Sequence, residues 1–188
     1  MLYHVSPTPG LKTLRPRVST HKKPYVYAIE NRETALLFGA KQDDFDFIIS
    51  TLPDGRPCVC ECRPNVFQEV YQGKSCSVYE VSETGFLRGI TGWEPELVCG
   101  GEVPVLRETA VPDLYQTLLA AEKENALVLE RYTFSDAYRR KIASHIVDRL
   151  LRFEIDLDAI LQTDNRFSLH YKALVLGLRA LMDGHLLP

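Results

Sequence analysis

The sequence predicts an α+β fold in which a strand-rich part is followed by a helical part. Through about residue 107, short segments rich in β-branched and aromatic residues alternate with loops that contain proline and glycine, whereas leucines recur at helical spacing after Pro112. Strands first and helices later are typical of α+β proteins. Apolar residues make up 45% of the 188-residue chain and charged residues 25%, so a sizeable core can form without disulfides or metal. We expect a strand-rich domain over residues 1–111 and a helical extension over 112–188, packed on or beside it.

Each element of the strand-rich part follows from a local signal. Prolines and Gly10 are expected to break regular structure in the loop over residues 6–24. Asn31 can cap a short helix that runs to about residue 40, and the sequence Pro53-Asp54-Gly55 predicts a hairpin turn. Strands are expected over residues 2–5, 25–29, 45–52, 57–62, 76–81, 96–98 and 103–106.

The helical part contains three segments with a helical pattern. Leu114, Leu118 and Leu119 mark the first. Ser135 can cap a second helix that runs to about residue 153 and is followed by a third over about 167–182, which Gly184 would end. The apolar face of the second helix is formed by Ile142, Ile146, Leu150 and Phe153, and that of the third by Leu174, Leu178 and Leu181.

Charge and targeting signals limit the expected partners. The formal net charge of −3 gives no general attraction to phosphate backbones, so a nucleic-acid partner would need a local basic patch. The run Arg139-Arg140-Lys141 is most simply the solvated face of a helix. No basic and apolar leader opens the chain, and its apolar runs are far shorter than the ~18–20 residues that span a bilayer. We therefore expect no membrane partner and a reducing, cytoplasmic location.

Three of the five cysteines alternate along one expected strand. Cys58, Cys60 and Cys62 share a face because residues two apart in a strand point the same way. The favoured interpretation is a strand that packs three small apolar side chains inward. The alternative is a soft-metal or redox patch, although no CxxC pair with zinc-ligand spacing is present.

Four features of the strand-rich part point to a common site. His4 lies on the opening strand, and Ser6 follows two residues later. Tyr27 ends the sequence Tyr-Val-Tyr and stands directly before Ala28. Phe38 lies eleven residues further along the chain. Glu96 lies at the start of an expected strand in the sequence Trp-Glu-Pro-Glu-Leu-Val.

In order and spacing these features resemble the ADP-ribosyltransferase superfamily, in the branch whose catalytic set is His-Tyr-Glu. The resemblance covers roughly residues 2–107 and implies a split β-sheet core that binds NAD as a substrate. It assigns dinucleotide binding to His4 and Ser6, stacking walls to Tyr27 and Phe38, and catalysis to Glu96 together with Tyr27. The chain departs from the family pattern at two positions: Val5 stands where the family often has Gly, and Phe38 where it often has Tyr.

These residue types suit cleavage of the glycosidic bond of NAD. The reaction develops positive, oxocarbenium-like charge on the ribose, which a nearby carboxylate stabilises. Two aromatic rings can sandwich the flat nicotinamide and fix the scissile bond. A histidine and a neighbouring hydroxyl can bond the adenosine ribose and the nicotinamide amide. Glu94, Glu80 and Glu102 are alternatives to Glu96, and no metal is expected at this site.

The sequence leaves several functional hypotheses open. The favoured one is ADP-ribosyl transfer from NAD, or NAD hydrolysis, with an acceptor that the motifs do not identify. The alternative is a catalytically inactive module of the same fold that binds a nucleotide or a protein. The RNA 2′-phosphotransferase branch ranks lower, because its arginine-rich active-site pattern is not evident. The loop after the first strand carries five basic residues that are expected to engage the pyrophosphate or an anionic acceptor: Lys12, Arg15, Arg17, Lys22 and Lys23.

Overall fold

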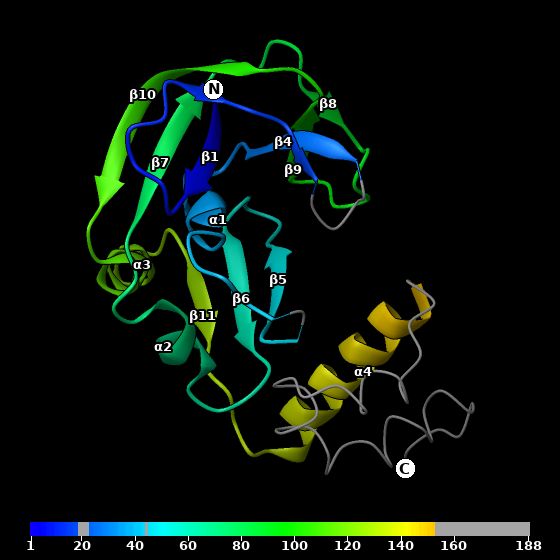
Figure 1. Cartoon of the computed structure of the whole chain (residues 1–188). Helices are drawn as coiled ribbons and strands as arrows, with labels where there is room; N and C mark the ends of the chain where they lie inside the picture. The colour runs from blue at the N-terminus through cyan, green and yellow to red at the C-terminus, as the bar shows by residue number, and fades with distance from the viewer. Residues whose placement is uncertain (19–22, 44, 153–188) are drawn as a thin grey trace. The chain divides into compact units, whose positions relative to one another are not determined.

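The computed structural model describes residues 1–18, 23–43 and 45–152. These residues form a mixed α+β structure with mostly antiparallel strands, which confirms the expected fold class (Figure 1). The chain divides into two compact units. Of the described residues, unit 1 holds those within Met1–Lys41 and Val70–Leu127, and unit 2 holds those within Gln42–Glu69 and 128–152. This division differs from the expected boundary between residues 111 and 112, because a strand after Leu127 pairs with the Pro57–Glu61 strand.

Unit 1 is built on one sheet. The order across it is β2-β10-β7-β1-β4-β9-β8, and β3 pairs with β4. Every register pair given for these strands is antiparallel. The strands are β1 (Leu2–Ser6), β2 (Thr13–Leu14), β3 (Arg17–Val18), β4 (Pro24–Ile29), β7 (Cys76–Val81), β8 (Leu87–Arg88), β9 (Glu96–Cys99) and β10 (Val103–Val111).

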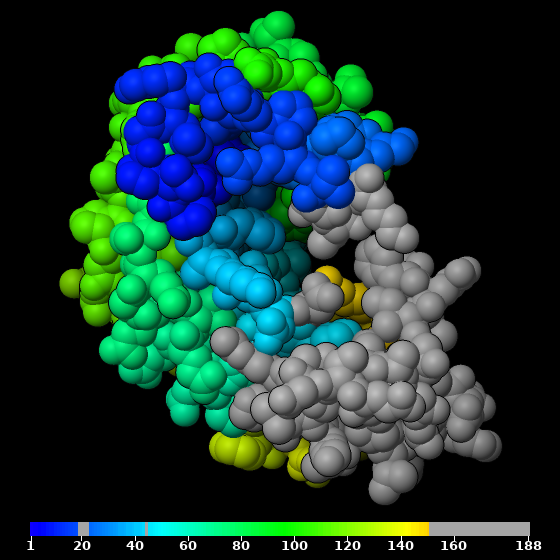
Figure 2. Space-filling model, in the orientation of Figure 1, coloured from blue at the N-terminus to red at the C-terminus, as the bar shows by residue number. Residues whose placement is uncertain are grey.

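The loop after β1 is more regular than the sequence predicts. β2 pairs with β10, and β3 pairs with β4. Pro16 lies between these two short strands, where its missing N–H removes no ladder hydrogen bond. The expectation that prolines exclude regular structure from residues 6–24 is therefore wrong for β2 and β3. Figure 2 shows the N-terminal segment, in blue, on the surface of unit 1.

Two helices of unit 1 begin at side-chain caps. α1 (Arg32–Leu36) follows Asn31, whose Oδ1 accepts a hydrogen bond from Thr34 N at 2.8 Å, which confirms the predicted cap. The helix ends before residue 40 because the next amides, through Gly39, bond the carbonyls three residues back in a tighter turn. α3 (Leu114–Lys123) is capped in the same way by Asp113. The core of unit 1 includes Leu2, Leu14, Val26, Ala28, Tyr79, Val81, Leu97, Cys99 and Val103.

Unit 2 contains a three-stranded sheet and a long helix. The sheet order is β11-β6-β5, with β5 (Phe47–Thr51) antiparallel and β11 (Val128–Glu130) parallel to β6 (Pro57–Glu61). The β5–β6 hairpin turns at Gly55, whose φ of +86° suits glycine, as the turn signal predicts. α4 (Asp136–Arg152) begins after Ser135, whose Oγ accepts from Tyr138 N at 3.3 Å. Three elements are not predicted from the sequence: β8, β11 and α2 (Val66–Tyr71). Of these, α2 begins in unit 2 and ends in unit 1.

The alternating cysteines pack into the core of unit 2. Cys58, Cys60 and Cys62 are buried together with Ile142 and Ile146 of α4, which confirms the inward-facing strand. Phe153 and the expected helix over 167–182 lie outside the described residues. Of the helices that the structure describes, none combines the length and the apolar character needed to cross a membrane.

Candidate functional site

Three adjacent strands of unit 1 bring together residues that are far apart in the sequence. His4 lies on β1, Tyr27 on β4 and Glu96 at the start of β9, and these strands are neighbours in the order β1-β4-β9. The register pairs Tyr27 with Val98 and Ile29 with Glu96. Tyr27 and Glu96 are therefore diagonal neighbours on one face of the sheet. Tyr3 pairs with Ile29 and shares this face, so the next residue, His4, points to the other face and meets Tyr27 at its backbone.

The electrostatics of Tyr27 reflect this arrangement. Its pKa is raised above the usual value, first by burial and then by the negative charge of Glu96, with a smaller contribution from Tyr25. The Tyr25 and Tyr27 rings meet edge to face, with centroids 6.2 Å apart. Tyr27 thus stays protonated at neutral pH and presents an aromatic ring beside a carboxylate.

His4 is fixed by its contact with the neighbouring strand. Its Nδ1 lies 2.8 Å from the backbone oxygen of Tyr27, and a carbonyl only accepts, so Nδ1 carries the proton. Burial lowers the pKa of His4, the bond to Tyr27 opposes this, and the positive charge of Arg17 lowers it further. His4 is therefore neutral at neutral pH, and its Nε2 is an acceptor.

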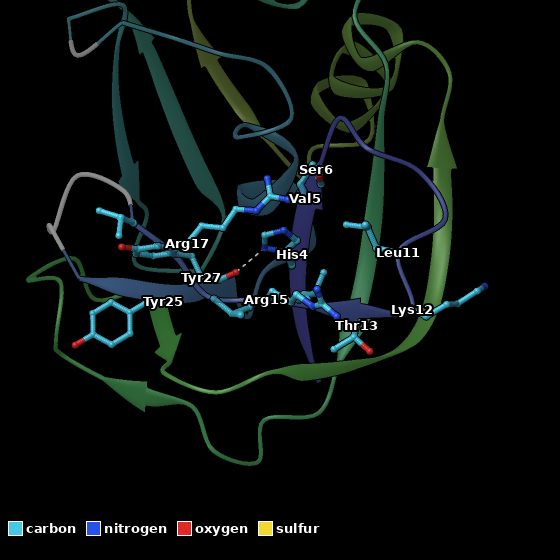
Figure 3. Close-up of a pocket in the computed structure, with 13 residues that line it drawn as sticks. His4, Val5, Ser6, Leu11, Lys12, Thr13, Arg15, Arg17, Tyr25 and Tyr27 are labelled. Carbon is cyan, nitrogen blue, oxygen red and sulfur yellow. Dashed lines mark hydrogen bonds between the residues drawn. The ribbon is translucent and has the colours of Figure 1, made fainter.

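A cavity of about 710 Å³ lies beside β1 and β4, which is within the usual range for ligand pockets. We call it the β1–β4 cavity (Figure 3). Three of the predicted site residues line it: His4, Ser6 and Tyr27. Phe38 and Glu96 are not among its lining residues. The lining consists of His4, Val5, Ser6, Leu11, Lys12, Thr13, Leu14, Arg15, Arg17, Val18, Tyr25, Val26 and Tyr27.

One wall of the β1–β4 cavity is basic. Lys12, Arg15 and Arg17 of the predicted cationic loop contribute to it, and Figure 3 shows the Arg17 side chain beside His4. Arg15 Nε also lies 3.2 Å from Glu102 Oε1, and both of these side chains are exposed. Lys22 lies outside the described residues, and Lys23 is not among the lining residues. The wall offers guanidinium and ammonium donors of the kind that bind phosphate oxygens.

Phe38 lies near the start of β9 rather than in the cavity lining. Its side chain is 41% exposed, and its ring centroid is 5.5 Å from that of Trp93. Trp93 in turn contacts the predicted catalytic residue Glu96 through the backbone, since Glu96 N donates a hydrogen bond to Trp93 O at 3.1 Å. An aromatic pair, of which Phe38 is exposed and Trp93 half-buried, therefore flanks the half-buried Glu96.

Two of the alternative glutamates are already paired with arginines. Glu80 on β7 is opposite Arg107 on β10, and the guanidinium donates two hydrogen bonds to its carboxylate. Glu102 pairs with Arg15 as described above. Glu94 is exposed and lies in the turn before β9. Of the four candidates, Glu96 is the one that lies beside Tyr27 on the sheet.

Glu108 on β10 does not line the cavity but holds the loop that does, a role that the sequence does not predict. Its Oε1 accepts from Gly10 N at 2.9 Å and from Ser77 Oγ at 2.7 Å. These bonds, the Gly10 amide first, hold the pKa of Glu108 below its usual value. Gly10 directly precedes Leu11 and Lys12 of the cavity wall, so Glu108 anchors the loop that forms it. A single glutamate in a strand carries no local signal for such a role.

Comparisons of this chain with protein-family models, with curated proteins and with solved structures find no match in any of the three.

Proposed function

We propose that this chain binds NAD in the β1–β4 cavity and cleaves its nicotinamide–ribose bond, by ADP-ribosyl transfer or by hydrolysis. One observation carries the proposal: His4 and Tyr27 line a cavity with a basic wall and are joined by the bond from His4 Nδ1 to Tyr27 O, and Glu96 on the next strand lies diagonally beside Tyr27. Each of these residue types matches one chemical requirement of the reaction.

The aromatic and carboxylate groups suit the reacting end of NAD. The Tyr27 ring provides a stacking face for nicotinamide, and the exposed Phe38 ring provides a second. Glu96 would stabilise positive charge as it develops on the ribose while the nicotinamide nitrogen takes the bonding electron pair. The acceptor, a hydroxyl, another nucleophile or water, then forms the new bond to the ribose carbon and releases its proton to solvent.

The polar groups of β1 suit ribose and amide recognition. Neutral His4 presents Nε2 as an acceptor for a ribose hydroxyl or for the nicotinamide N–H. Ser6 Oγ accepts from Thr8 N at 3.1 Å, which leaves its own proton to donate to a ligand. Arg15, Arg17 and Lys12 are suited to the two negative charges of the pyrophosphate.

A second candidate is a module that binds a nucleotide without turning it over. The observation that favours it is that Glu96 and Phe38 are not among the lining residues of the β1–β4 cavity, whereas the groups assigned to ribose and phosphate are. In this case the cavity holds the ligand, and Glu96 contributes little to its binding or its chemistry.

Isothermal titration of the full chain with NAD tests the binding step. We expect saturable binding for the wild type and about 5- to 150-fold weaker binding for Tyr27→Ala, because the loss of one stacking ring removes about 1–3 kcal/mol. The matched control is Tyr115→Ala on α3, which removes a half-buried tyrosine of unit 1 remote from the cavity lining. Absence of heat at millimolar NAD contradicts the proposal.

Release of nicotinamide from NAD separates the two candidates. In an enzyme, Glu96→Gln keeps the shape of the side chain and lowers turnover at least about 100-fold while NAD affinity stays near that of the wild type. A binding module shows the same affinity for both proteins and no release from either. Glu94→Gln serves as the control, because this exposed carboxylate lies two residues away.

A further inference from the structure

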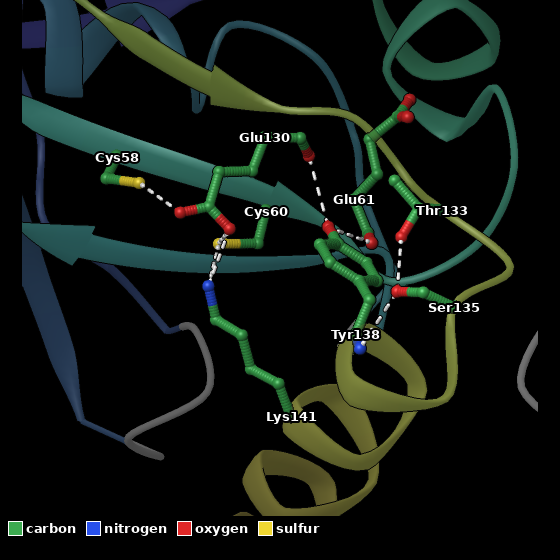
Figure 4. A network of polar contacts seen from close by, with 8 residues as sticks. All are labelled: Cys58, Cys60, Glu61, Glu130, Thr133, Ser135, Tyr138 and Lys141. Atoms are coloured by element: carbon green, nitrogen blue, oxygen red, sulfur yellow. Dashed lines mark hydrogen bonds and ion pairs between the residues drawn. The ribbon is translucent and has the colours of Figure 1, made fainter.

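Unit 2 contains a cluster of metal-ligating side chains that the proposed function does not use (Figure 4). Cys58 and Cys60 lie on one face of β6, and the parallel register with β11 places Glu130 opposite Cys60. One ligand atom from each of these three residues lies within 4.8 Å of the other two. The three donors thus come from two strands that are distant in the sequence and adjacent in the sheet.

The spacing of these donors matches a tetrahedral zinc ion. Zinc binds thiolate sulfur at about 2.3 Å and carboxylate oxygen at about 2.0–2.2 Å, so neighbouring ligand atoms of a tetrahedral site lie about 3.3–3.8 Å apart. Glu130 Oε2 lies 3.3 Å from Cys60 Sγ, and Glu130 Oε1 lies 3.8 Å from Cys58 Sγ. Each oxygen of the carboxylate thus faces one of the two sulfur atoms.

Glu130 and Cys60 already contact a positive charge, the ammonium group of Lys141. Lys141 of α4 places Nζ 2.6 Å from Glu130 Oε2 and 3.4 Å from Cys60 Sγ, although the sequence favoured a solvated face for this residue. Its side chain is 48% exposed and that of Glu130 is 39% exposed, whereas both cysteines are buried. The ammonium can therefore move toward solvent, and a metal ion can enter from that side.

We propose that Cys58, Cys60 and Glu130 bind a Zn²⁺ ion. Two sulfur ligands and one carboxylate oxygen are a donor set that zinc prefers, and three protein ligands leave the fourth tetrahedral position to water. The charges balance as well, because two thiolates and one carboxylate carry −3, which Zn²⁺ and the Lys141 ammonium neutralise.

Metal uptake would exchange protons for the ion. Burial, and then the hydrogen bond to Glu130, raises the pKa of Cys60 to about 12, and burial together with Glu130 also raises the pKa of Cys58. Both thiols are thus protonated without metal. Binding of one Zn²⁺ breaks two S–H bonds, forms two Zn–S bonds and releases two protons to solvent, with no change in oxidation state.

Titration of the full chain with Co²⁺, a coloured substitute for zinc, tests the proposal. Thiols are kept reduced with a phosphine, and the near-ultraviolet thiolate-to-cobalt band is followed. We expect a band that saturates at one Co²⁺ per chain in the wild type, is displaced by Zn²⁺, and is lost in Cys58→Ser and Cys60→Ser. The zinc affinity of these variants should fall at least about 100-fold, more than the loss of an outer-shell partner causes.

Cys62→Ser is the matched control, because Cys62 is buried in the same core and lies outside the three-residue cluster. It should keep the cobalt band. Glu130→Gln changes a part-exposed side chain, so it tests the site even if a cysteine variant does not fold, and it should weaken zinc binding. A wild type without a thiolate–cobalt band overturns the proposal, as does a band that survives in Cys58→Ser and Cys60→Ser.

Discussion

Removal of one oxygen atom from Tyr79 tests how the wall of the β1–β4 cavity is held in place. The Tyr79 ring is fully buried; its hydroxyl accepts from Leu11 N at 3.3 Å, donates to Thr8 O at 2.6 Å and also lies 3.2 Å from Glu108 Oε1. The single hydroxyl proton serves both acceptors, so Tyr79→Phe keeps the ring and removes one donated and one accepted bond. Each bond contributes about 0.5–1.5 kcal/mol, or about 1–3 kcal/mol together. Thr8 is exposed and Leu11 is half-buried, so water replaces part of the loss and we expect about 1 kcal/mol.

Urea denaturation followed by circular dichroism measures the stability change, and NAD titration measures the consequence for the cavity. In Tyr79→Phe, NAD binding must supply about 1 kcal/mol to order the loop. The affinity for NAD therefore falls roughly fivefold. The control is Tyr138→Phe, which removes a hydroxyl that contacts Glu61 O at 3.0 Å in unit 2 and should leave NAD affinity unchanged. An unfolding midpoint for Tyr79→Phe equal to that of the wild type would refute the reasoning.

Three further predictions concern the cap, the histidine and the buried ion pair. Asn31→Ala should lower the free energy of unfolding by about 1 kcal/mol in urea titration, because Thr34 N loses its acceptor, and an unchanged midpoint would contradict this. Because folding lowers the pKa of His4 from 6.5, the unfolded chain binds the proton more tightly, so stability is lost as pH falls below about 6.5. His4→Gln should lose stability less steeply than the wild type between pH 7.5 and 5, and parallel curves would exclude this contribution. Asp46→Asn should cost about 3 kcal/mol, because Arg63 is only 2% exposed and its Nε bonds Asp46, with Asp54→Asn at an exposed ion pair as the near-neutral control.

Local signals in the sequence were sufficient for many elements. Asn31 and Ser135 cap the helices that they were expected to cap, and the turn at Gly55 joins the predicted hairpin. These signals succeed because the interaction that decides the structure is made within a few residues of the signal.

Elements that depend on distant partners were missed. β11 is three residues long and becomes a strand through pairing with β6, whose Cys58 lies seventy positions before its partner Val128. The basic loop was identified from composition, but which of its side chains face the β1–β4 cavity depends on how β2 and β3 pair with other strands. The anchoring role of Glu108 likewise exists only once β10 lies beside β7. Such contacts leave no periodic trace in the sequence.

The passage of the chain from unit 1 to unit 2 and back has a consequence for folding during synthesis. The β5–β6 hairpin leaves the ribosome long before β11 and α4, so β6 at first has an unpaired edge and an apolar face formed by its cysteines. A chain that stops after Leu127 contains both segments of unit 1 but lacks β11. Hydrogen exchange on that nascent-length chain should show protected amides in β7 and rapid exchange in β6. We therefore expect unit 1 to fold first. Until β11 is synthesised, the β5–β6 hairpin keeps an exposed edge to which chaperones can bind.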